Sequence, residues 1–503
     1  MSLDSSPEVL FAHAYMVGRD PARHRLMHPL APLRPAEVAA WVHGAGGGSV
    51  DLWDSTFRLD PASFEVEVSR RRPRIIWLYC HPATRSAAMA MVAAGRRNGA
   101  VVLVGGPDAV LQPRSYLEGG AHAAIDDDGA EEATLSLVLA LRAAQYRIDP
   151  ALFARVCGLY HLDKAGALLF NEGPSRRSSD LALIQPLRDP VQTRIHLESW
   201  RAVRGSRVLA IRSGRGCPIP CGFCSQSVFG QPYVRREPLD VVREMVELSK
   251  RFEFDRFVFV DEIFLFDTVW LREFAAELKS QRLDIPFEAQ AHPALVRREM
   301  VQTLAEVGLA HVDLAAGSGS AALLARLGWP HRSSDVYKAV PWLRDRGITF
   351  GLQMLVGLPG ETAEDLSASL EMVKLVAPDA VEACRVDAGS RALLQKIWER
   401  VVAGELVAGP GCDLRPASSR ASAARDAAVA WMRSQGEPSG DLVDRWIGRL
   451  RRPVWRGMVQ MLPEPTRRNL STLPVARLLR SPSSASGVLS AAAETLERAE
   501  QHG

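Results

Sequence analysis

The stretch Arg215–Cys224, RGCPIPCGFC, decides how the rest of the chain is interpreted. It holds three cysteines in a C-x3-C-x2-C spacing, namely Cys217, Cys221 and Cys224. Thiolates are soft ligands that suit zinc or iron–sulfur clusters. A closed zinc site needs a fourth Cys or His at short spacing, but the next His is His292 and the next Cys is Cys384. Three thiolates on a four-iron cluster leave one iron open, and an open iron can bind a substrate or cofactor.

Two plainer interpretations of this triplet stay open, namely three unpaired buried thiols and a partial zinc knuckle. Three of the seven cysteines lie within eight residues, however, and their loop interrupts a strand–helix pattern. Pro218 and Pro220 restrict the loop, whereas Gly216 and Gly222 allow backbone angles that other residues resist. The pattern therefore favours a metal cluster.

Length and composition indicate a globular protein of two or three domains, because 503 residues exceed one ordinary core. The hydrophobic share of 47% and the charged share of 24% are those of a soluble globular protein. A net charge of +3 gives no general attraction to nucleic acid or an anionic membrane, so neither is an expected partner. Seven cysteines, an odd number, argue against a disulfide framework and fit a reducing cytoplasm. We expect neither a signal peptide nor a membrane span, because no apolar run reaches the roughly 18 residues that a span needs.

Residues 1–145 alternate between apolar strand patterns and helical patterns. Arg74–Cys80 and Ala100–Val104 are near-continuous apolar runs, as expected for strands that are covered on both faces. Alternating strands and helices predict a parallel, doubly wound (Rossmann-like) sheet, which binds ligands beyond the carboxyl ends of its strands. The loops expected there are 54–56, 81–86, 105–107 and 126–129.

Residues 205–390 repeat a strand–helix unit six times, and the first unit carries the cysteine loop. The expected strands are Arg207–Ile211, Arg256–Val260, Pro286–Ala291, His311–Ala316, Thr349–Val356 and Ala380–Val386. Thr362 and Asp365 predict a capping box at the start of the helix after the fifth strand. The carboxyl ends of such strands form one rim, as in (β/α) barrels, so we expect the active site on that rim.

The cysteine triplet, with the aromatic Phe223 just before its last cysteine, resembles the signature of the radical S-adenosylmethionine (SAM) superfamily. The resemblance covers residues 205–390 and implies a partial (β/α)6 barrel with a [4Fe–4S] cluster on the three cysteines. It also implies that SAM chelates the fourth iron. The positions that match the family's SAM contacts follow or end the second to fifth strands: Asp261, Glu262, Gln290, Ser318 and Gln353. Glu262 is also a candidate catalytic residue.

The string Val101–Pro107, with the proline and strand start that follow it, resembles the cobalamin-binding domain that precedes many radical SAM modules. The resemblance spans most of residues 8–145 and implies cobalamin contacts from strand-end residues, which are Asp54, Thr56, Thr84, Ser86, Gly105, Gly106, Pro107 and Gly129. The Asp-x-His-x-x-Gly motif that supplies a His ligand to cobalt is absent, so no such ligand is expected. The acidic loop 126–131 departs from the family's Gly-Glu-Gly-Glu-like loop. Arg85 is a candidate catalytic cation beneath the corrin, unless it is a solvated surface arginine.

Two segments lie outside these resemblances. Residues 146–204 are punctuated by prolines and are interpreted as a linker with some packed structure. Residues 391–503 are rich in Ala, Arg and Ser and show helical patterns, so a mostly helical C-terminal domain is expected. In related enzymes a C-terminal region covers the substrate, so substrate specificity is expected there.

Together the two resemblances imply a cobalamin-dependent radical SAM methyltransferase of the class B family, in natural-product (antibiotic) biosynthesis. Such an enzyme moves a methyl group from SAM, via methylcobalamin, to a carbon of a small-molecule or peptide intermediate. It also needs an electron donor such as flavodoxin or ferredoxin. Two other reactions stay open: cyclisation or rearrangement without net methylation, and polar methyl transfer to an aromatic carbon such as that of indole. The polar route would follow if Glu262 ligated the open iron in place of SAM. A non-catalytic binding protein is a further alternative, against which the three cysteines argue.

Overall fold

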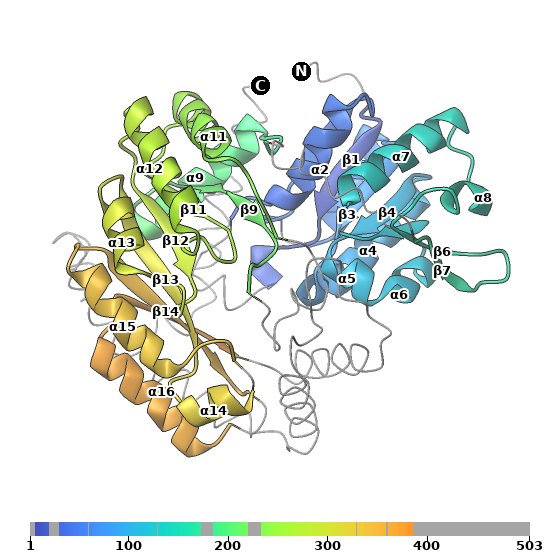
Figure 1. The fold of residues 1–503 in the computed structure, drawn as a ribbon. Coiled ribbons are helices and arrows are strands. Elements are labelled where there is room, and N and C mark those ends of the chain that lie inside the picture. The colour runs from blue at the N-terminus through green and yellow to red at the C-terminus, as the bar shows by residue number, and fades with distance from the viewer. Residues whose placement is uncertain are drawn as a thin grey trace, which may run out of the picture. The chain divides into compact units, whose positions relative to one another are not determined.

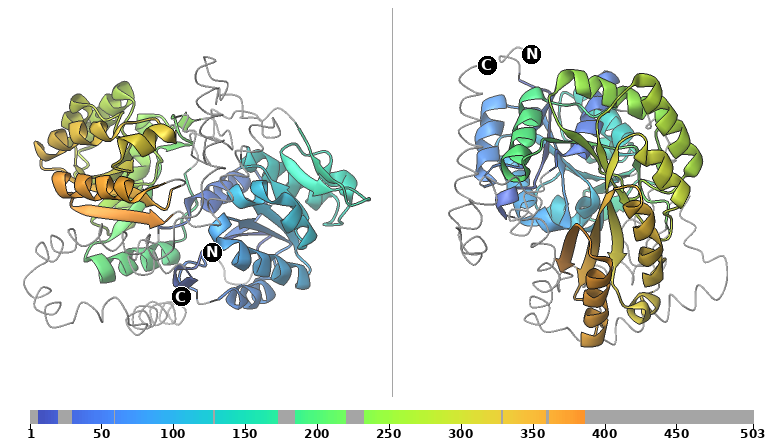
Figure 2. Two further views of the ribbon diagram at one scale, coloured as in Figure 1. Left: turned by 90° about the horizontal axis from the view of Figure 1, so that it is seen from below. Right: turned by 90° about the vertical axis from the view of Figure 1, so that its left-hand side faces the viewer.

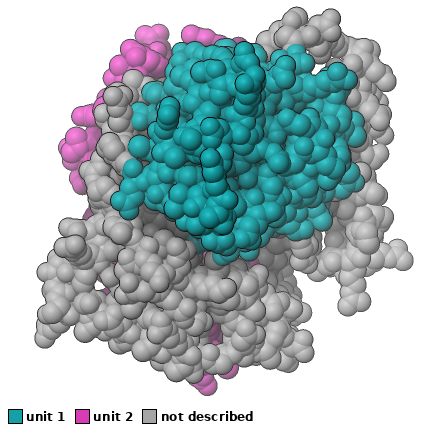
Figure 3. All heavy atoms as spheres, turned by 90° about the vertical axis from the view of Figure 1, so that its right-hand side faces the viewer, with its two compact units in different colours: residues 1–209, 481–503 teal, residues 210–480 magenta. Residues whose placement is uncertain are grey.

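A computed structural model describes most of the first 385 residues, in the ranges 6–19, 30–58, 60–127, 129–172, 185–219, 233–327, 329–358 and 361–385. These residues fall into two compact units, one that runs up to Leu209 and one that starts at Ala210 (Figure 3). We call them unit 1 and unit 2 and describe each by itself. The helical domain expected at 391–503 lies outside the described residues.

Unit 1 is built on a seven-stranded sheet, counted over its described residues, with the order β2-β1-β3-β4-β5-β6-β7 (Figure 1). The strands are β1 (Val9–His13), β2 (Val50–Trp53), β3 (Ile75–Tyr79), β4 (Val101–Gly105), β5 (Ala123–Ile125), β6 (Leu159–Leu162) and β7 (Leu168–Phe170). The first five pair in parallel, and β6 and β7 are antiparallel. The order reverses at β1, which makes the carboxyl ends of β1 and β3 the switch point where such sheets bind ligands. The parallel, doubly wound sheet is as expected.

Helices cover both faces of this sheet (Figure 2). Those that contribute to its two cores are α2 (Leu33–Gly44), α3 (Ala62–Arg71), α4 (Arg85–Arg97), α5 (Pro107–Leu111), α6 (Pro113–Glu118), α7 (Ala130–Ala143) and α8 (Pro150–Phe153). Unit 1 also contains α9 (Pro190–Arg204) and the short 3-10 turns η1 (Val17–Arg19) and η2 (Pro82–Thr84). Leu10 and Ala12 belong to the core with α3 and α4, whereas Val9 and Phe11 belong to the core with α2 and α7. Because successive strand residues face opposite cores, the strands are apolar throughout.

The sheet extends further along the chain than the sequence suggested. Residues 146–204, interpreted as a linker, contribute α8, β6, β7 and α9, and β6 pairs directly with β5. The strands β6 and β7 are short, and their antiparallel pairing needs no crossover helix, so the strand–helix alternation gave no signal for them. The helix α5 was also missed, because it holds five residues between a glycine pair and the next proline.

Unit 2 is built on a six-stranded sheet whose strands follow in sequence order, β8-β11-β12-β13-β14-β15 (Figure 1). They are β8 (Val208–Ile211, which begins just before the unit boundary), β11 (Arg256–Phe259), β12 (Phe287–Ala291), β13 (Leu309–Gly317), β14 (Thr349–Val356) and β15 (Ala380–Arg385). The neighbouring strands from β11 to β15 all pair in parallel. A two-stranded ribbon of β9 (Gly214–Arg215) and β10 (Val234–Arg235) brackets the cysteine loop.

Helices lie along one face of this second sheet (Figure 2). They are α11 (Pro238–Arg251), α12 (Thr268–Gln281), α13 (Arg298–Ala305), α14 (Ala321–Arg326), α15 (Ser333–Arg344) and α16 (Ala363–Val376). The expected capping box is present, because Thr362 Oγ1 accepts from Asp365 N and Asp365 accepts from Thr362 N. Strand residues alternate between buried and half-buried, so the face away from the helices keeps polar side chains such as Gln290 and Gln353. None of the helices in the described ranges is long and apolar enough to cross a membrane.

Candidate active site

At the carboxyl ends of β1 and β2, a buried carboxylate joins two histidines. Asp54 Oδ1 lies 2.8 Å from His13 Nε2, and Asp54 Oδ2 lies 2.6 Å from His196 Nε2 on α9. Tyr15 N–H donates to His13 Nδ1, so His13 donates to Asp54 through Nε2. Burial opposes ionisation of Asp54, but the charges and hydrogen bonds of the two histidines outweigh it and hold the pKa of Asp54 well below its usual range. Asp54 is therefore a structural anion that joins α9 to the sheet.

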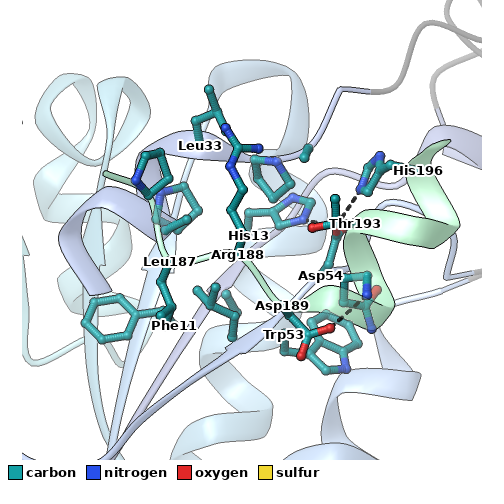
Figure 4. Close-up of a pocket in the computed structure, with 18 residues that line it drawn as sticks. Phe11, His13, Leu33, Trp53, Asp54, Leu187, Arg188, Asp189, Thr193 and His196 are labelled. Carbon is teal, nitrogen blue, oxygen red and sulfur yellow. Dashed lines mark hydrogen bonds and ion pairs between the residues drawn. The ribbon is translucent and has the colours of Figure 1, made fainter. Parts of the chain in front are cut away.

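A pocket opens beside this cluster, as Figure 4 shows. Its apolar walls include Phe11, Leu33 and Trp53, and its polar side includes Thr193 and His196 of α9. The space between atoms there is about 480 Å³ when the part open to solvent is counted. The switch point lies between β1 and β3, whereas the pocket lies toward the edge strand β2, on the other side of β1. The pocket is therefore beside the edge where the cofactor is predicted to bind.

The candidate cation Arg85 begins α4 and is held by buried partners. Its Nε donates to Asp108 Oδ2 at 2.8 Å, and its Nη2 donates to the other oxygen of the same carboxylate. Tyr116 Oη donates to Asp108 Oδ2 at 2.6 Å. The Asp108 hydrogen bond raises the pKa of Arg85 above its ordinary value. Arg85 is thus not a freely solvated arginine. The buried carboxylate of Asp108 balances its positive charge and holds its guanidinium in place.

The glycines at the carboxyl end of β4 allow a close approach of backbone and rings. Gly106 has φ +89°, and a Cβ there would lie 2.7 Å from the Cys80 carbonyl oxygen. A Cβ on Gly105 would lie 2.5 Å from the Trp77 ring. Pro107 follows as the first residue of α5. Both glycines are therefore required by close packing inside unit 1, and cobalamin contacts from Gly105, Gly106 and Pro107 stay predictions.

Acidic residues in and after the loop that follows β5 pair with an arginine on α2. Arg34 of α2, itself buried, donates through Nε to Asp127 Oδ1 at 2.9 Å and through Nη1 to Glu131. These two carboxylates raise the pKa of Arg34 against the effect of burial. Gly129 caps α7 with φ +80°. The acidic residues that depart from the family's loop therefore form an internal ion-pair network.

The remaining candidates at this edge are uncharged. Thr56 is buried, and its Oγ1 has no hydrogen-bond partner among the described residues. Thr84 Oγ1 donates to the His81 carbonyl at 3.0 Å and so closes η2, while Ser86 is exposed. Small residues, an exposed serine and an orphaned hydroxyl fit a broad, flat ligand with polar groups at its periphery, as cobalamin has.

At the second rim, the two carboxylates after β11 have different roles. Asp261 is buried and accepts from Ser213 N at 2.8 Å and from Ser213 Oγ at 2.6 Å. Burial raises the pKa of Asp261, although both Ser213 hydrogen bonds lower it. Glu262 keeps an exposed surface, and displacement of water by the surrounding protein, together with Asp261, raises its pKa while Arg212 lowers it. Of the two, Glu262 is the carboxylate that a ligand can reach.

The other predicted SAM contacts lie on strands of the same sheet. Gln290 lies on β12 opposite Asp313 on β13, and Gln353 on β14 lies opposite Glu382 on β15. All four are on the face away from the helices. Ser318, by contrast, is buried and lies 3.1 Å from the Ser369 hydroxyl of α16. Its hydroxyl serves the packing of α16, and a SAM contact from Ser318 stays a prediction.

The cysteine site is described in part. Cys217 is half-buried, directly after Gly216, which has φ +80°. Cys221, Cys224 and Phe223 lie outside the described residues. The three thiolates fit an iron–sulfur cluster by their donor chemistry and by the ribbon that brackets their loop.

Two rim features were missed from the sequence. His331 Nε2–H donates to the Ala316 carbonyl at 3.0 Å, so its Nδ1 accepts from His292 Nε2 at 3.1 Å. His292 follows β12 directly, and burial together with His331 lowers its pKa to about 4. Glu361 Oε2 accepts from Gly357 N at 2.6 Å, and burial raises the pKa of Glu361 to about 7. His292 directly follows β12, and Glu361 lies five residues beyond the last residue of β14, so a position after a strand end is the signal that could have found them.

The comparisons with known sequences agree with this geometry. Residues 211–373 match the radical SAM superfamily. The chain is 32% identical over 178 residues to the anaerobic magnesium-protoporphyrin IX monomethyl ester cyclase of Rubrivivax gelatinosus, which is 34% of this chain and 32% of that protein. It is 29% identical over 177 residues to the cytidylyl-2-hydroxyethylphosphonate methyltransferase of Streptomyces wedmorensis, 33% of each chain. The chain thus spans about a third of the length of these curated relatives.

Solved structures extend the likeness beyond this segment. The radical SAM methyltransferase TsrM from Kitasatospora setae, with tryptophan and a SAM analogue bound, has a TM-score of 0.60 at 20% identity, over 75% of this chain and 72% of that chain. The cobalamin-dependent radical SAM enzyme OxsB, with aqua-cobalamin bound, has a TM-score of 0.59 at 15% identity, over 80% of this chain and 57% of that chain.

The radical SAM match confirms the resemblance that the cysteine triplet indicated, and it implies a [4Fe–4S] cluster and SAM as cofactors. The structural likeness is to proteins that also bind cobalamin. Residues 211–373 are therefore a radical SAM domain, and the chain shares its fold with the cobalamin-dependent radical SAM methyltransferases.

Proposed function

We propose that this chain is a cobalamin-dependent radical SAM methyltransferase, which transfers a methyl group from SAM to a carbon of a small-molecule or peptide natural-product intermediate. The observation that carries the proposal is the order of parts: a doubly wound sheet precedes a radical SAM domain. The likeness to TsrM over 75% of the chain supports it. When bound, the cluster and SAM supply an electron and a radical, and cobalamin carries the methyl group.

In this function Cys217, Cys221 and Cys224 would hold the cluster. Glu262 would bind the SAM amino group, because its neighbour Asp261 already accepts two hydrogen bonds from Ser213 and is buried. Asp261 instead fixes the chain between β8 and the cysteine loop. A Glu262→Gln variant should therefore weaken SAM binding by about tenfold or more, as expected for the loss of a charged hydrogen-bond acceptor.

At the edge of unit 1, cobalamin would meet neutral groups rather than free charges. Thr56, Ser86 and Gly129 would contact its periphery, and Gly105–Pro107 would allow its close approach. Arg85 would keep its positive charge near the ring only as an ion pair with Asp108. Asp54 would not touch the cofactor, because both of its oxygens are bonded to histidines.

Two other reactions are supported by single observations. The bound tryptophan in TsrM favours polar methyl transfer to an aromatic carbon such as that of indole. The identity to the magnesium-protoporphyrin cyclase favours cyclisation or rearrangement without net methylation. In the first case no 5′-deoxyadenosine would form in step with product. In the second case the product would lack the added mass of a methyl group.

We further propose that the enzyme works in the cytoplasm, where thiols stay reduced. We expect its electron donor to be a small redox protein such as flavodoxin or ferredoxin. Specificity for the substrate would come from residues 391–503, which lie outside the described residues. A nucleic acid or membrane partner is not expected at a net charge of +3.

The direct test is anaerobic reconstitution of the full chain with iron, sulfide and hydroxocobalamin, followed by incubation with SAM, a reductant and candidate substrates. The proposal expects S-adenosylhomocysteine, 5′-deoxyadenosine and a methylated product in matched amounts. A chain that binds the cluster but neither binds cobalamin nor methylates any substrate would contradict it.

A further inference from the structure

The pocket beside Asp54 is formed by three segments of unit 1 that are far apart in the sequence. The ends of β1 and β2 supply Phe11 and Trp53, and the start of α2 supplies Leu33. The third wall is the segment 186–196, which leads into α9 and includes its first turns (Figure 4). The walls therefore come from described residues of a single unit.

Hydrogen bonds at both ends of the segment 186–196 hold this wall in place. Near its start, Leu187 N–H donates to the Ala36 carbonyl of α2 at 3.0 Å. At its end, His196 Nε2 lies 2.6 Å from Asp54 Oδ2, directly after β2. The lining also contains prolines, whose backbone is restricted, namely Pro32, Pro35 and Pro186. The pocket is thus formed before any ligand arrives.

A buried polar atom of the pocket wall is left without a partner. His196 is 4% exposed, and its Nδ1 has no hydrogen bond to any described residue. Its Nε2 faces Asp54, whose pKa is depressed, so Nε2 carries the hydrogen and the neutral ring has a lone pair on Nδ1. Phe57 packs against the same ring with centroids 4.9 Å apart and helps to hold it. A fixed, buried acceptor at a pocket wall calls for a donor from the molecule that fills the pocket.

The rest of the wall restricts the kind of molecule that carries this donor. Phe11 and Trp53 are buried aromatic residues, and Leu33 is a buried aliphatic one. Such walls favour an apolar body, and a ring can pack edge-on or offset against Phe and Trp. Arg188 and Asp189 also line the pocket and carry opposite charges, so a net charge on the ligand is not favoured.

We propose that this pocket binds a small, uncharged aromatic molecule that donates one hydrogen bond, from an O–H or N–H group, to His196 Nδ1. The ligand would contact the ends of β1 and β2 on one side and α9 on the other, and so would hold α9 more firmly to the sheet. The site is separate from the predicted cobalamin edge at β1 and β3. The inference does not rest on the proposed function, because the groups that carry it belong neither to the cluster nor to the SAM site.

The test uses the full chain without cluster or cobalamin, titrated with phenol and with anisole. The two probes share a ring, but anisole has no O–H group to donate. Titration calorimetry should show that phenol binds about tenfold or more tightly than anisole, because anisole leaves the buried Nδ1 unpaired. Phenol should also slow hydrogen exchange at the amides of residues 187–196, since it holds that segment against the strands.

A variant of the pocket wall locates the binding site. Ala36 lines the pocket from α2, so the larger side chain of Ala36→Leu should occupy the space that the ring needs. Phenol binding should then be lost, while the melting temperature stays unchanged or rises because a cavity is filled. Ala40→Leu, one turn further along α2 and not part of the pocket lining, is the matched control and should bind phenol as wild type does.

Equal affinities for phenol and anisole, or phenol binding that survives Ala36→Leu, would overturn the inference. Should Ala36→Leu fail to fold, the two probes and the exchange map of the wild type still decide it. Displacement of phenol by hydroxocobalamin would also overturn it, because the pocket would then belong to the cofactor edge. A chain that binds phenol as expected but takes up no iron would support this inference and contradict the proposed function.

Discussion

The carboxyl edge of unit 1 and the carboxyl rim of unit 2 treat their charged and polar groups differently. In unit 1 the charges neutralise one another: Asp54 binds two histidines, Arg85 binds Asp108, and Arg34 binds Asp127 and Glu131. In unit 2 two buried carboxylates accept from neutral donors instead, Asp261 from Ser213 and Glu361 from Gly357, and burial raises the pKa of both.

The difference teaches how each site would bind. An edge whose charges are internally balanced binds a ligand by shape and neutral contacts, and is stable before the ligand arrives. A rim whose buried carboxylates are held only by neutral donors can gain a counter-charge from what binds there. We therefore expect unit 2 to depend on its cofactors for stability more strongly than unit 1.

The largest effect should come from Cys217→Ser. Loss of one of three thiolate ligands should abolish cluster binding and all SAM cleavage, because serine is a poor ligand for iron of this kind. Iron content and 5′-deoxyadenosine formation measure the loss. Cys157→Ser, at an exposed cysteine of unit 1, is the control and should retain both. A Cys217→Ser protein with full iron content would contradict the assignment.

The next effect should come from Asp54→Asn. The amide turns an N–H toward one of the two histidines, so a buried pair is broken, and the free energy of unfolding should fall by about 3–5 kcal/mol. Hydrogen exchange of β1 and α9, together with the denaturant midpoint, measures this. Glu118→Gln, which breaks an exposed pair with Arg114, should cost no more than about 0.5 kcal/mol.

The difference in stability between wild type and Asp54→Asn should disappear at low pH. The folded-state pKa of Asp54 is depressed, so its stabilisation is complete above the unfolded pKa of about 4 and is lost as the pH falls through the folded value. Wild type and Asp54→Asn should therefore draw closer in stability as the pH falls below that unfolded pKa and become equal only below the folded pKa. A constant difference between them at all pH values would show that the carboxylate charge is not the cause.

A smaller effect of opposite sign should come from Glu361. Its pKa is raised from 4.5 to about 7, so the folded state binds the proton more tightly than the unfolded state does. The stabilisation is present below about pH 4.5 and is lost as the pH rises through 7. Wild type should lose up to about 3 kcal/mol over that range relative to Glu361→Gln, as melting temperatures of the two proteins would show. Parallel pH profiles would refute this.

The smallest effect should come from Thr56→Val. The Thr56 hydroxyl has no protein partner in the described residues, so its loss should leave stability unchanged, while cobalamin affinity falls about five- to tenfold. Titration of the reconstituted chain with hydroxocobalamin measures the affinity. Thr134→Val on α7, which removes another buried hydroxyl of the same kind, should leave the affinity unchanged. Equal affinities for wild type and Thr56→Val would exclude Thr56 from the cofactor edge.

Local patterns predicted the fold well. The strand Thr349–Val356 and the helix Pro113–Glu118 have the predicted bounds, because a proline, a glycine or a cap marks their ends. The strands β6 and β7 were missed, since three or four residues of weak alternation carry little signal. Periodicity reports local structure and says little about which distant segments complete a sheet.

The site was predicted less completely. Strand-end positions gave Asp54 and Asp261, but their roles depend on His196, which is 142 residues from Asp54, and on Ser213, which is 48 residues from Asp261. The spacing of residues in the sequence does not predict such distant partners. Both carboxylates were predicted as ligand contacts, and the structure shows each of them hydrogen-bonded within its own unit, while a role of Glu262 in binding SAM stays a prediction.

The bond between Asp54 and His196 also sets where this protein can be cut or joined. A chimera that took residues 1–145 as the proposed cobalamin module would remove α9 and leave Asp54 buried with one histidine, and a protease-resistant fragment should end after Arg204 rather than before Pro150. Transplants of this module between enzymes would thus need to carry the helix that leads into β8, even though the sheet's parallel strands end long before it.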